Sequence, residues 1–557
     1  GGEAEIDAIV GKAQALTALS RYDGVVDCMN ELAARHPGFA PAASEKAKAR
    51  LAASDFDGAS ENCTLGLASD SDDCECHRIQ VFLTLTRTGD YTQARAQMGL
   101  LEEALHRREP RNYLLHLDVA KQIARVAGGD VGVLTTCGRL LDKALQLDPE
   151  NVSLLLERAH QLRFLNKYVD ALDLYASVTS ANEATKQKKQ KKQIANSVLF
   201  GTAMCLLLRG KFTEASGLIE QFAETSVASM DTGAAGLPLS FLSALSQHLD
   251  EGNASAKFVE ETINNLENSM TSFLQNLNKH PHAIDTFVAM DPDVMIKSAF
   301  IFTEHDFAQS SQGFGERDAS TSSASNINQA NVVDVAGNDA TPRSLRILEA
   351  LCMRAPGLVV AQEHLMRARF AAGCLEASAR TASALLRLRD QHAEAHVMLE
   401  RIHLAHSDHV SARQALDAAT ANDFSVRGTT EYAVVSARCA AAEGDTRKAL
   451  GEIEAAMKLP GVRVVMKSST GNSTTIKSVP MSTADRASLF VAYADALSLA
   501  NRGDEAEKVL DEAAKVFTGT SSEIFVMIAR CDIAVVRGDD SKALRVLSRV
   551  TPDSPHY

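Results

Sequence analysis

The segments GDYTQA (89–94), NKYVDA (166–171), GKFTEA (210–215), GDTRKA (444–449) and GDDSKA (538–543) decide the fold of this chain. Each opens with a turn signal and closes with a small residue that begins a new helix. Less regular copies recur elsewhere, and we take the last residue of each copy as its anchor. The anchors are Val25, Ala59, Ala94, Ala171, Ala215, Ala377, Ala412, Ala449, Lys508 and Ala543. Five gaps between neighbouring anchors measure 34 to 37 residues, which indicates an internal repeat of that length.

The order of residue types at the turn indicates the kind of repeat. A period of about 34 residues, with glycine, then an aromatic residue, then a small residue, is typical of the tetratricopeptide repeat (TPR), a helix–turn–helix unit. Glycine ends the first helix in a backbone conformation that other residues rarely adopt. The aromatic residue fills the space between the helices, and the small anchor lets two helix backbones approach. We therefore predict an all-α TPR superhelical solenoid. The residues expected to pack its repeats together are Tyr91, Ala94, Ala144, Ala159, Tyr168, Ala171, Phe212, Ala215, Ala377, Ala412, Ala449 and Ala543.

A repeat with a degenerate turn precedes Ala171. The segment KALQLDPEN (143–151) is typical of the end of a second helix, because Pro149 cannot continue that helix. Placing Ala144 and Pro149 in their usual positions predicts an anchor at Cys137, 34 residues before Ala171.

The repeat signals are uneven along the chain and predict four parts. These are TPR repeats at 1–225, divergent helical repeats at 226–307, a flexible Ser- and Asn-rich insert at 308–341, and TPR repeats at 342–557 with a loop at 462–481. The chain begins Gly1-Gly2 and stops within a repeat, so we expect it to be an internal fragment of a longer array.

Composition and charge narrow the class of function. Apolar residues make up 45% of the chain and charged residues 23%, which is typical of a helical globular protein rather than a disordered one. A net charge of −14 argues against a nucleic-acid binder, which would present a basic face. No stretch of about 18 apolar residues occurs, so we predict no membrane span. The ten cysteines are scattered, and we expect buried, reduced thiols.

The run KQKKQKKQ (186–193) is the densest cluster of charge in the chain. It could be a solvated loop or helix end, and it could contact an acidic partner such as another protein's acidic helix; lipid head groups and nucleic acid are weaker alternatives. As a partner contact, the candidate residues are Lys186, Lys188, Lys189, Lys191 and Lys192.

We find no motif for catalysis, a cofactor or a metal. The segment STGNST (469–474) lacks the G-x-x-x-x-G-K of a phosphate loop. Cysteine and histidine meet in CECH (74–77), with Cys63 nearby, but a second ligand pair at zinc spacing is missing. We therefore predict that the chain is not an enzyme and needs no cofactor.

Binding of a terminal carboxylate is also not indicated. Co-chaperone TPR modules use Lys and Asn four residues apart on the first helix of a repeat for this purpose. The corresponding positions here hold Leu156 and His160, Val434 and Arg438, and Ile528 and Asp532. A groove that binds whole helices or folded subunits is therefore favoured.

Three segments carry a more specific resemblance: KALQLDPENVSLLLERAHQLRFLNKYVDALDLY (143–175), LPGVRV (459–464) and TGTSSEIFVMIARCDIAVVRGDDSKALRVLSRVTPDSPHY (518–557). They resemble the tetratricopeptide repeat protein 21 family, the large TPR subunit of intraflagellar transport complex A. The resemblance implies a cytoskeleton-associated component of the cilium or flagellum and basal body that supports retrograde transport. It also implies packing against other complex A subunits, with complex B or ciliary cargo as further candidate partners. The alternatives are a TPR scaffold of another cytoplasmic complex and, more remotely, an enzyme.

Overall fold

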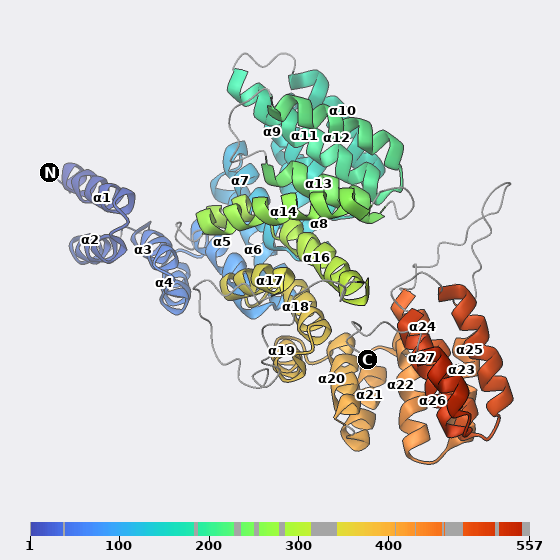
Figure 1. The fold of residues 1–557 in the computed structure, drawn as a ribbon. Helices are drawn as coiled ribbons and strands as arrows, with labels where there is room; N and C mark the ends of the chain where they lie inside the picture. The colour runs from blue at the N-terminus through green and yellow to red at the C-terminus, as the bar shows by residue number, and fades with distance from the viewer. Residues whose placement is uncertain are drawn as a thin grey trace, which may run out of the picture. The chain divides into compact units, whose positions relative to one another are not determined.

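The predicted all-α solenoid is confirmed (Figure 1). The computed structural model describes residues 2–36, 39, 41–182, 188–227, 236–249, 256–277, 284–312, 342–406, 408–428, 430–458, 462, 483–517 and 523–547. Within these residues the chain forms 27 α-helices, a π-helical turn and a short 3₁₀ helix, and no β-strand.

The helices follow one another along the chain with short connections. The first sixteen, with the π-helical turn, are α1 (Gly2–Ala18), α2 (Tyr22–Arg35), α3 (Pro41–Ala52), α4 (Phe56–Ser69), α5 (Cys74–Leu83), η1 (Thr84–Thr88), α6 (Tyr91–Arg108), α7 (Tyr113–Val126), α8 (Val131–Leu147), α9 (Val152–Phe164), α10 (Tyr168–Asn182), α11 (Lys188–Leu208), α12 (Phe212–Val227), α13 (Gly236–Leu249), α14 (Ala256–Leu277), α15 (Ile284–Met290) and α16 (Pro292–Gln312). The remainder are α17 (Arg343–Arg354), α18 (Val359–Ala371), α19 (Leu375–Leu388), α20 (Ala393–Ala405), α21 (His409–Asn422), η2 (Phe424–Gly428), α22 (Thr430–Ala442), α23 (Thr446–Ala456), α24 (Thr483–Leu499), α25 (Gly503–Phe517), α26 (Glu523–Val536) and α27 (Asp540–Leu547).

Aspartate begins many of the second helices of the repeats. The side chains of Asp55, Asp90, Asp130, Asp408 and Asp445 each accept a hydrogen bond from the backbone N–H three residues later. The first N–H groups of a helix have no partner within the helix, so this cap satisfies one of them and contributes about 1 kcal/mol. The sequence reasoning used the glycine of the GD turn and missed the role of the aspartate beside it.

The turn inside each hairpin needs a left-handed residue, and that residue is not always glycine. The φ angle is 64° at Gly89, 74° at Gly210, 75° at Gly373, 86° at Gly444 and 76° at Gly538. The same place in other repeats is taken by four residues with φ between 56° and 65°: Ser20, Ser54, Asn166 and Asn501. The repeat geometry therefore holds side chains in a conformation that costs them energy.

Three predicted anchors are displaced from their structural positions. In the regular repeats the anchor is the fourth residue of the second helix, as Ala94 is in α6. By this rule the anchor of α8 is Leu134 rather than Cys137, because the helix starts early at Val131. The other two corrections, both set by where the second helix begins, replace Ala377 by Ser378 in α19 and Lys508 by Ala506 in α25.

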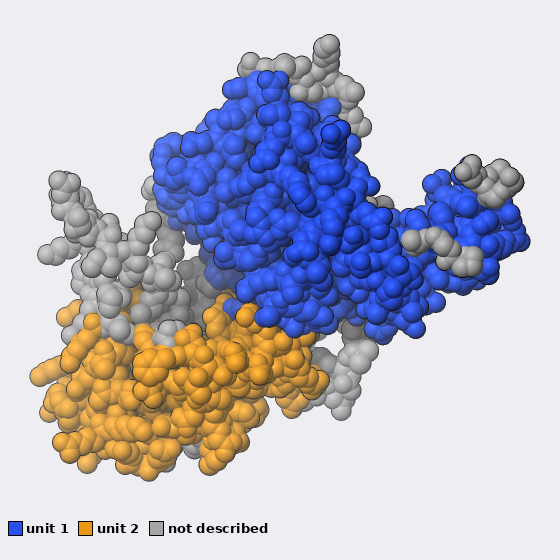
Figure 2. Space-filling model, turned by 180° about the vertical axis from the view of Figure 1, so that it is seen from behind, with its two compact units in different colours: residues 1–302, 343–365 blue, residues 303–342, 366–557 orange. Residues whose placement is uncertain are grey.

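Two compact units make up the chain (Figure 2). Unit 1 comprises residues 1–302 and 343–365, and unit 2 comprises residues 303–342 and 366–557. The division differs from the predicted one, because α17 and the start of α18 pack with unit 1. In particular, Arg346 Nη2 donates to Glu267 Oε1 at 3.0 Å, and Arg354 Nη2 donates to the carbonyl of Leu277 at 3.2 Å.

The predicted irregular segments fall largely outside the described residues. Helix α16 continues to Gln312, so the first five residues of the insert predicted at 308–341 are helical; Ala and Gln in this stretch are compatible with a helix. Residues 313–341 lie outside the described residues, as does the predicted loop at 462–481 apart from Val462, which is buried.

The turn between α17 and α18 packs on the π-helical turn η1 of unit 1. The backbone N–H of Gly357 donates to the carbonyl of Thr86 at 2.7 Å, which gives this carbonyl at the end of the helix a partner. The approach is close: a Cβ on Gly357 would lie 2.7 Å from the Arg87 carbonyl carbon and from the Gly89 backbone nitrogen. Only glycine fits there without displacement of the backbone.

Candidate functional site

The residues predicted to pack the repeats lie mostly between helices. Eight of the nine alanines are buried, with six of them fully inaccessible to solvent: Ala94, Ala144, Ala159, Ala171, Ala215 and Ala412. Ala449 and Ala543 are almost completely buried as well. Tyr91, Tyr168 and Phe212 are half-buried. Ala377 is also only half-buried, while its neighbour Ser378 is fully buried and donates its hydroxyl to the carbonyl of Met366 at 2.8 Å.

The predicted lysine cluster falls at the start of α11. Lys186 lies outside the described residues, and Lys188 and Lys189 open the helix. Lys191 is half-buried and Lys192 is exposed. These lysines place positive charge on the first turns of a helix, where the helix dipole favours negative charge. Positive charge at Lys188, Lys189, Lys191 and Lys192 is therefore unfavourable for the start of this helix.

Polar contacts connect the first helices of neighbouring repeats in unit 1. Arg78 on α5 donates to Gln122 on α7 at 2.8 Å. Arg125 on α7 forms two hydrogen bonds with Glu157 on α9, at 2.8 and 3.0 Å, and both side chains are buried. Because removing either partner would leave the other charge buried and unpaired, this pair fixes how the two helices pack.

The second helices carry a separate set of ion pairs, spaced by about one repeat. Arg139 on α8 donates to both carboxylate oxygens of Glu102 on α6, at 2.6 Å for the shortest contact. Arg95 Nε on α6 donates to Asp130 Oδ1 at 2.9 Å. These arginines are exposed, so each pair contributes at most about 1 kcal/mol. These ion pairs therefore place charge on the surface and contribute little to the stability of the fold.

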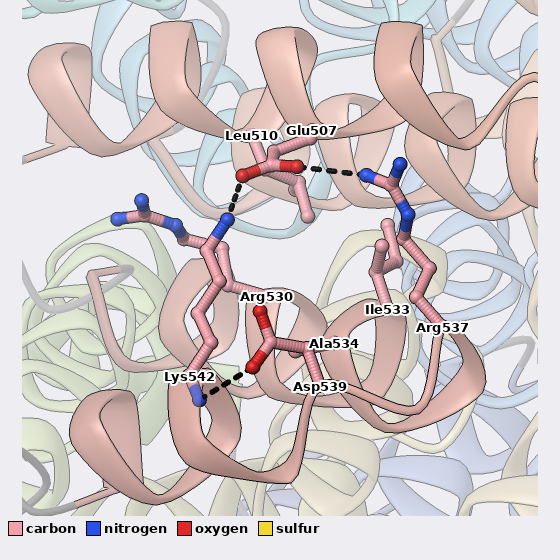
Figure 3. Close-up of a pocket in the computed structure, with 8 residues that line it drawn as sticks. All are labelled: Glu507, Leu510, Arg530, Ile533, Ala534, Arg537, Asp539 and Lys542. Atoms are coloured by element: carbon pink, nitrogen blue, oxygen red, sulfur yellow. Dashed lines mark hydrogen bonds and ion pairs between the residues drawn. The ribbon is translucent and has the colours of Figure 1, made fainter.

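A groove of about 360 Å³ lies among α25, α26 and α27 in unit 2 (Figure 3). Its floor is apolar and formed by Leu510, Ile533 and Ala534, which are buried. Its rim is charged, and Glu507 lies between Lys542 and Arg537, with Arg537 Nη1 at 2.8 Å from its carboxylate. An apolar floor with a rim of both charges is suited to a protein segment rather than to a highly charged small molecule.

The Arg530 side chain lies on the other side of the groove floor from Arg537 (Figure 3). Arg530 lies within α26, and Arg537 is the first residue after that helix ends at Val536. Arg530 Nη2 donates to Asp511 Oδ1 on α25 at 2.5 Å. The sequence reasoning did not find this groove, because only Asp539 and Lys542 among its lining residues belong to the turn signature GDDSKA (538–543).

His160, which falls at a clamp position, is buried and cannot contact a peptide terminus. Its Nδ1 is hydrogen-bonded to the hydroxyl of Tyr175 at 2.8 Å. Burial, reinforced by the charges of Arg125 and Arg163, holds the pKa of His160 well below its usual value of 6.5. The histidine is therefore neutral in the folded chain and serves the packing of α9 against α10.

The cysteines are distributed through the helix interfaces. All ten are free thiols; eight are buried, Cys74 is half-buried and Cys374 is exposed. Burial raises the pKa of Cys205 and of Cys439 to about 11, which makes these thiols poor nucleophiles. Among the described residues, no three His, Cys, Asp or Glu side chains gather as metal ligands would, and this includes the CECH segment.

Two family models cover most of the chain. The model described as tetratricopeptide repeat protein 21 second ARM domain matches residues 96–407, and the model described as tetratricopeptide repeat protein 21 ARM repeat matches residues 424–557. The chain belongs to the tetratricopeptide repeat protein 21 family. The resemblance expected from three short segments thus extends over both units.

Animal members of the family match along almost the whole chain at low identity. Human tetratricopeptide repeat protein 21B is 25% identical over 553 residues, which is 99% of this chain and 39% of the relative. Mouse tetratricopeptide repeat protein 21A is also 25% identical over 553 residues, covering 99% of this chain and 38% of the relative. The chain therefore spans about two fifths of the length of these family members.

The solved structures that match this chain have low TM-scores and low sequence identity. The Cut9–Hcn1 structure of the APC/C gives a TM-score of 0.36 at 12% identity, covering 99% of this chain and 94% of that one. Yeast Tom70 gives a TM-score of 0.33 at 12% identity, covering 98% and 100%. Among the described helices of this family member, none is long and apolar enough to cross a membrane.

Proposed function

We propose that this chain is part of a non-catalytic scaffold subunit of intraflagellar transport complex A that supports retrograde transport and cargo trafficking. The observation that carries the proposal is the family match, which extends through both units. A repeat array binds through the faces that its helix pairs leave open, and it needs no catalytic group. The proposed partners are other complex A subunits, with complex B and ciliary cargo as further candidates. The proposed location is the cilium or flagellum and the basal body, in association with the cytoskeleton.

The experiment that tests this proposal is affinity capture of the full-length protein from ciliated cells, followed by mass spectrometry. We expect complex A subunits in stoichiometric amounts. Stoichiometric capture of an unrelated cytoplasmic complex without complex A subunits would contradict the proposal and favour a TPR scaffold of that other complex.

Within unit 2, we propose the groove among α25, α26 and α27 as a partner contact. The support is its buried apolar floor beside exposed charge, a combination typical of the centre and rim of protein interfaces. Replacing both Arg530 and Lys542 by alanine should weaken co-purification of one partner while the helix content is kept. The matched control is Arg139→Ala, which removes an exposed ion pair of unit 1 and should leave co-purification unchanged.

The lysines at the start of α11 are a second proposed contact, for an acidic partner. Replacing all five lysines by glutamate should weaken binding of that partner and make the residual binding less sensitive to salt, because screened charge attraction would be lost. Unchanged binding would identify the run as a solvated helix end.

A further inference from the structure

A cavity of about 230 Å³ inside unit 1 has no role in the packing described so far. It lies between the ends of α7 and α9 and the start of α16, and the α17–α18 connection forms another wall. Its walls are partly apolar, from Phe164, Ile296 and Leu358, and partly charged, from Arg163, Lys297 and Asp293. Small-ligand sites combine apolar walls with a small number of convergent polar groups in this way.

Arg163 is the polar group in this cavity that most needs a further partner. Its side chain is 3% exposed. Its guanidinium lies over the ring of Phe164, 4.6 Å from the ring centroid, so one face is covered by an aromatic ring. A guanidinium has five N–H donors, yet within the described residues Arg163 makes one hydrogen bond, at 3.4 Å to Asp293, and its buried Nε has no partner. A buried guanidinium with unused donors requires an acceptor.

The neighbouring carboxylates satisfy only part of the Arg163 guanidinium. Asp293 is held by Lys297, whose Nζ donates to its two oxygens at 2.5 and 2.6 Å. Glu157 is fully engaged by both terminal nitrogens of Arg125. Asp291 adds negative charge near Arg163 but does not line the cavity. Asp293 takes one Arg163 donor at 3.4 Å and is shared with Lys297, so the Nε of Arg163 is left without a protein acceptor beside the cavity.

We propose that this cavity binds a small oxyanion, a phosphate or a carboxylate, through the guanidinium of Arg163 with Lys297 at its rim. The planar fork of arginine matches two oxygens of such an anion, and the apolar walls lower the local dielectric and strengthen the contact. The site is distinct from the proposed protein contacts, since its lining residues belong neither to the groove of unit 2 nor to the lysine run at 186–192. Free phosphate and free carboxylate share this chemistry and are separated by the probes used.

The test is isothermal titration of the purified chain with inorganic phosphate and, separately, with acetate, at an ionic strength matched by chloride. We expect saturable binding of one or both anions, and the one bound identifies the source. We expect Arg163→Gln to weaken binding by about ten-fold or more, the size of effect typical for loss of a charged hydrogen bond. The matched control Arg95→Gln removes an exposed arginine near the start of α6 that does not line the cavity, and it should bind as wild type does.

Absence of saturable binding of both anions to the wild-type chain would overturn the proposal. Wild-type affinity in Arg163→Gln would also overturn it, and so would an equal loss of affinity in Arg95→Gln. If circular dichroism shows that Arg163→Gln does not fold, Arg163→Lys replaces it. This variant keeps the charge and loses the planar fork, and unchanged affinity in it would likewise count against the proposed geometry.

Discussion

The buried histidine His160 couples the stability of unit 1 to pH. His160 is neutral in the folded chain because burial and two neighbouring arginines lower its pKa, whereas in the unfolded chain it titrates near 6.5. The unfolded state therefore binds the extra proton below that value, and stability is lost as pH falls through it.

We expect the free energy of unfolding to decrease by about 1.4 kcal/mol per pH unit from this group between pH 6 and pH 5. Comparing urea unfolding of the wild-type chain with His160→Gln measures the difference, because the other histidines are common to both. Identical pH dependence in the two proteins would show that His160 does not carry this proton linkage.

The left-handed serine at the α3–α4 turn gives a second prediction at the residue scale. Ser54 has φ of 65°, a conformation that glycine adopts without the penalty of a Cβ. We expect Ser54→Gly to stabilise the chain by about 0.5–1 kcal/mol. The matched control is Ser60→Gly inside α4, which should destabilise by about the same amount because glycine weakens a helix. Thermal unfolding of both variants shows whether glycine stabilises the left-handed position in the turn and destabilises the position in the helix.

The exposed thiol should react with a thiol reagent faster than the buried thiols do. Cys374 is the exposed cysteine, at the start of α19. We expect a thiol reagent to label Cys374 within the first minutes under native conditions, and the buried thiols only after unfolding. Mass spectrometry of the labelled peptides checks the order. Rapid native labelling of Cys137 or Cys205 would contradict the packing of their helices.

At the scale of helices, substituting two glycines distinguishes the effect of side-chain packing on stability from the effect of helix propensity. A Cβ on Gly201 in α11 would lie 2.3 Å from the ring of Tyr175, whereas a Cβ on Gly217 in α12 would meet no atom within 4 Å. We expect Gly201→Ala to destabilise the chain by about 1–3 kcal/mol through overpacking. Gly217→Ala should stabilise it by about 0.5–1 kcal/mol, since alanine is the better helix former. Equal effects in urea unfolding would mean that α10 and α11 do not pack as described.

The sequence predicted the second helices best, because each is marked by a turn, a cap and a small residue within six positions. It placed the anchor of α19 one residue early, since Ala377 has the expected residue type while Ser378 has the buried position. It could not predict the groove or the cavity. The cavity residues come from helices far apart in the chain, such as Arg163 and Asp293, and no local pattern joins them. The groove residues come from three consecutive helices, and most of them lie outside the turn signature.

At the scale of the whole molecule, we expect the two fragments produced by cleavage between α16 and α17 to stay associated. Residues 343–365 pack with unit 1, although residues 313–341 come before them in the chain. We expect that a protease site engineered into 313–341 yields two fragments that still elute together in gel filtration under native conditions. The fragments should separate when Gly357 is replaced by Val, since a side chain there would meet the backbone of Arg87 and Gly89.

The control for this experiment is Gly451→Ala in α23, where a Cβ would meet no atom within 4 Å. It should leave the two fragments together. Separation of the wild-type fragments after cleavage would contradict the packing of α17 on unit 1.

The contact between Gly357 and Thr86 also determines the order in which unit 1 can be completed. Neighbouring repeats form from contacts close in sequence, which is fast, whereas this hydrogen bond closes a loop of 271 residues. During synthesis from the N-terminus, the repeats from α1 to α12 are made long before α17 leaves the ribosome. We expect refolding of the chain to show an early phase of helix formation and a later phase in which this closure occurs. Gly357→Val should remove the late phase in stopped-flow measurements and leave the early one. The helical hairpins of unit 1 would then form without the closing contact between Gly357 and Thr86.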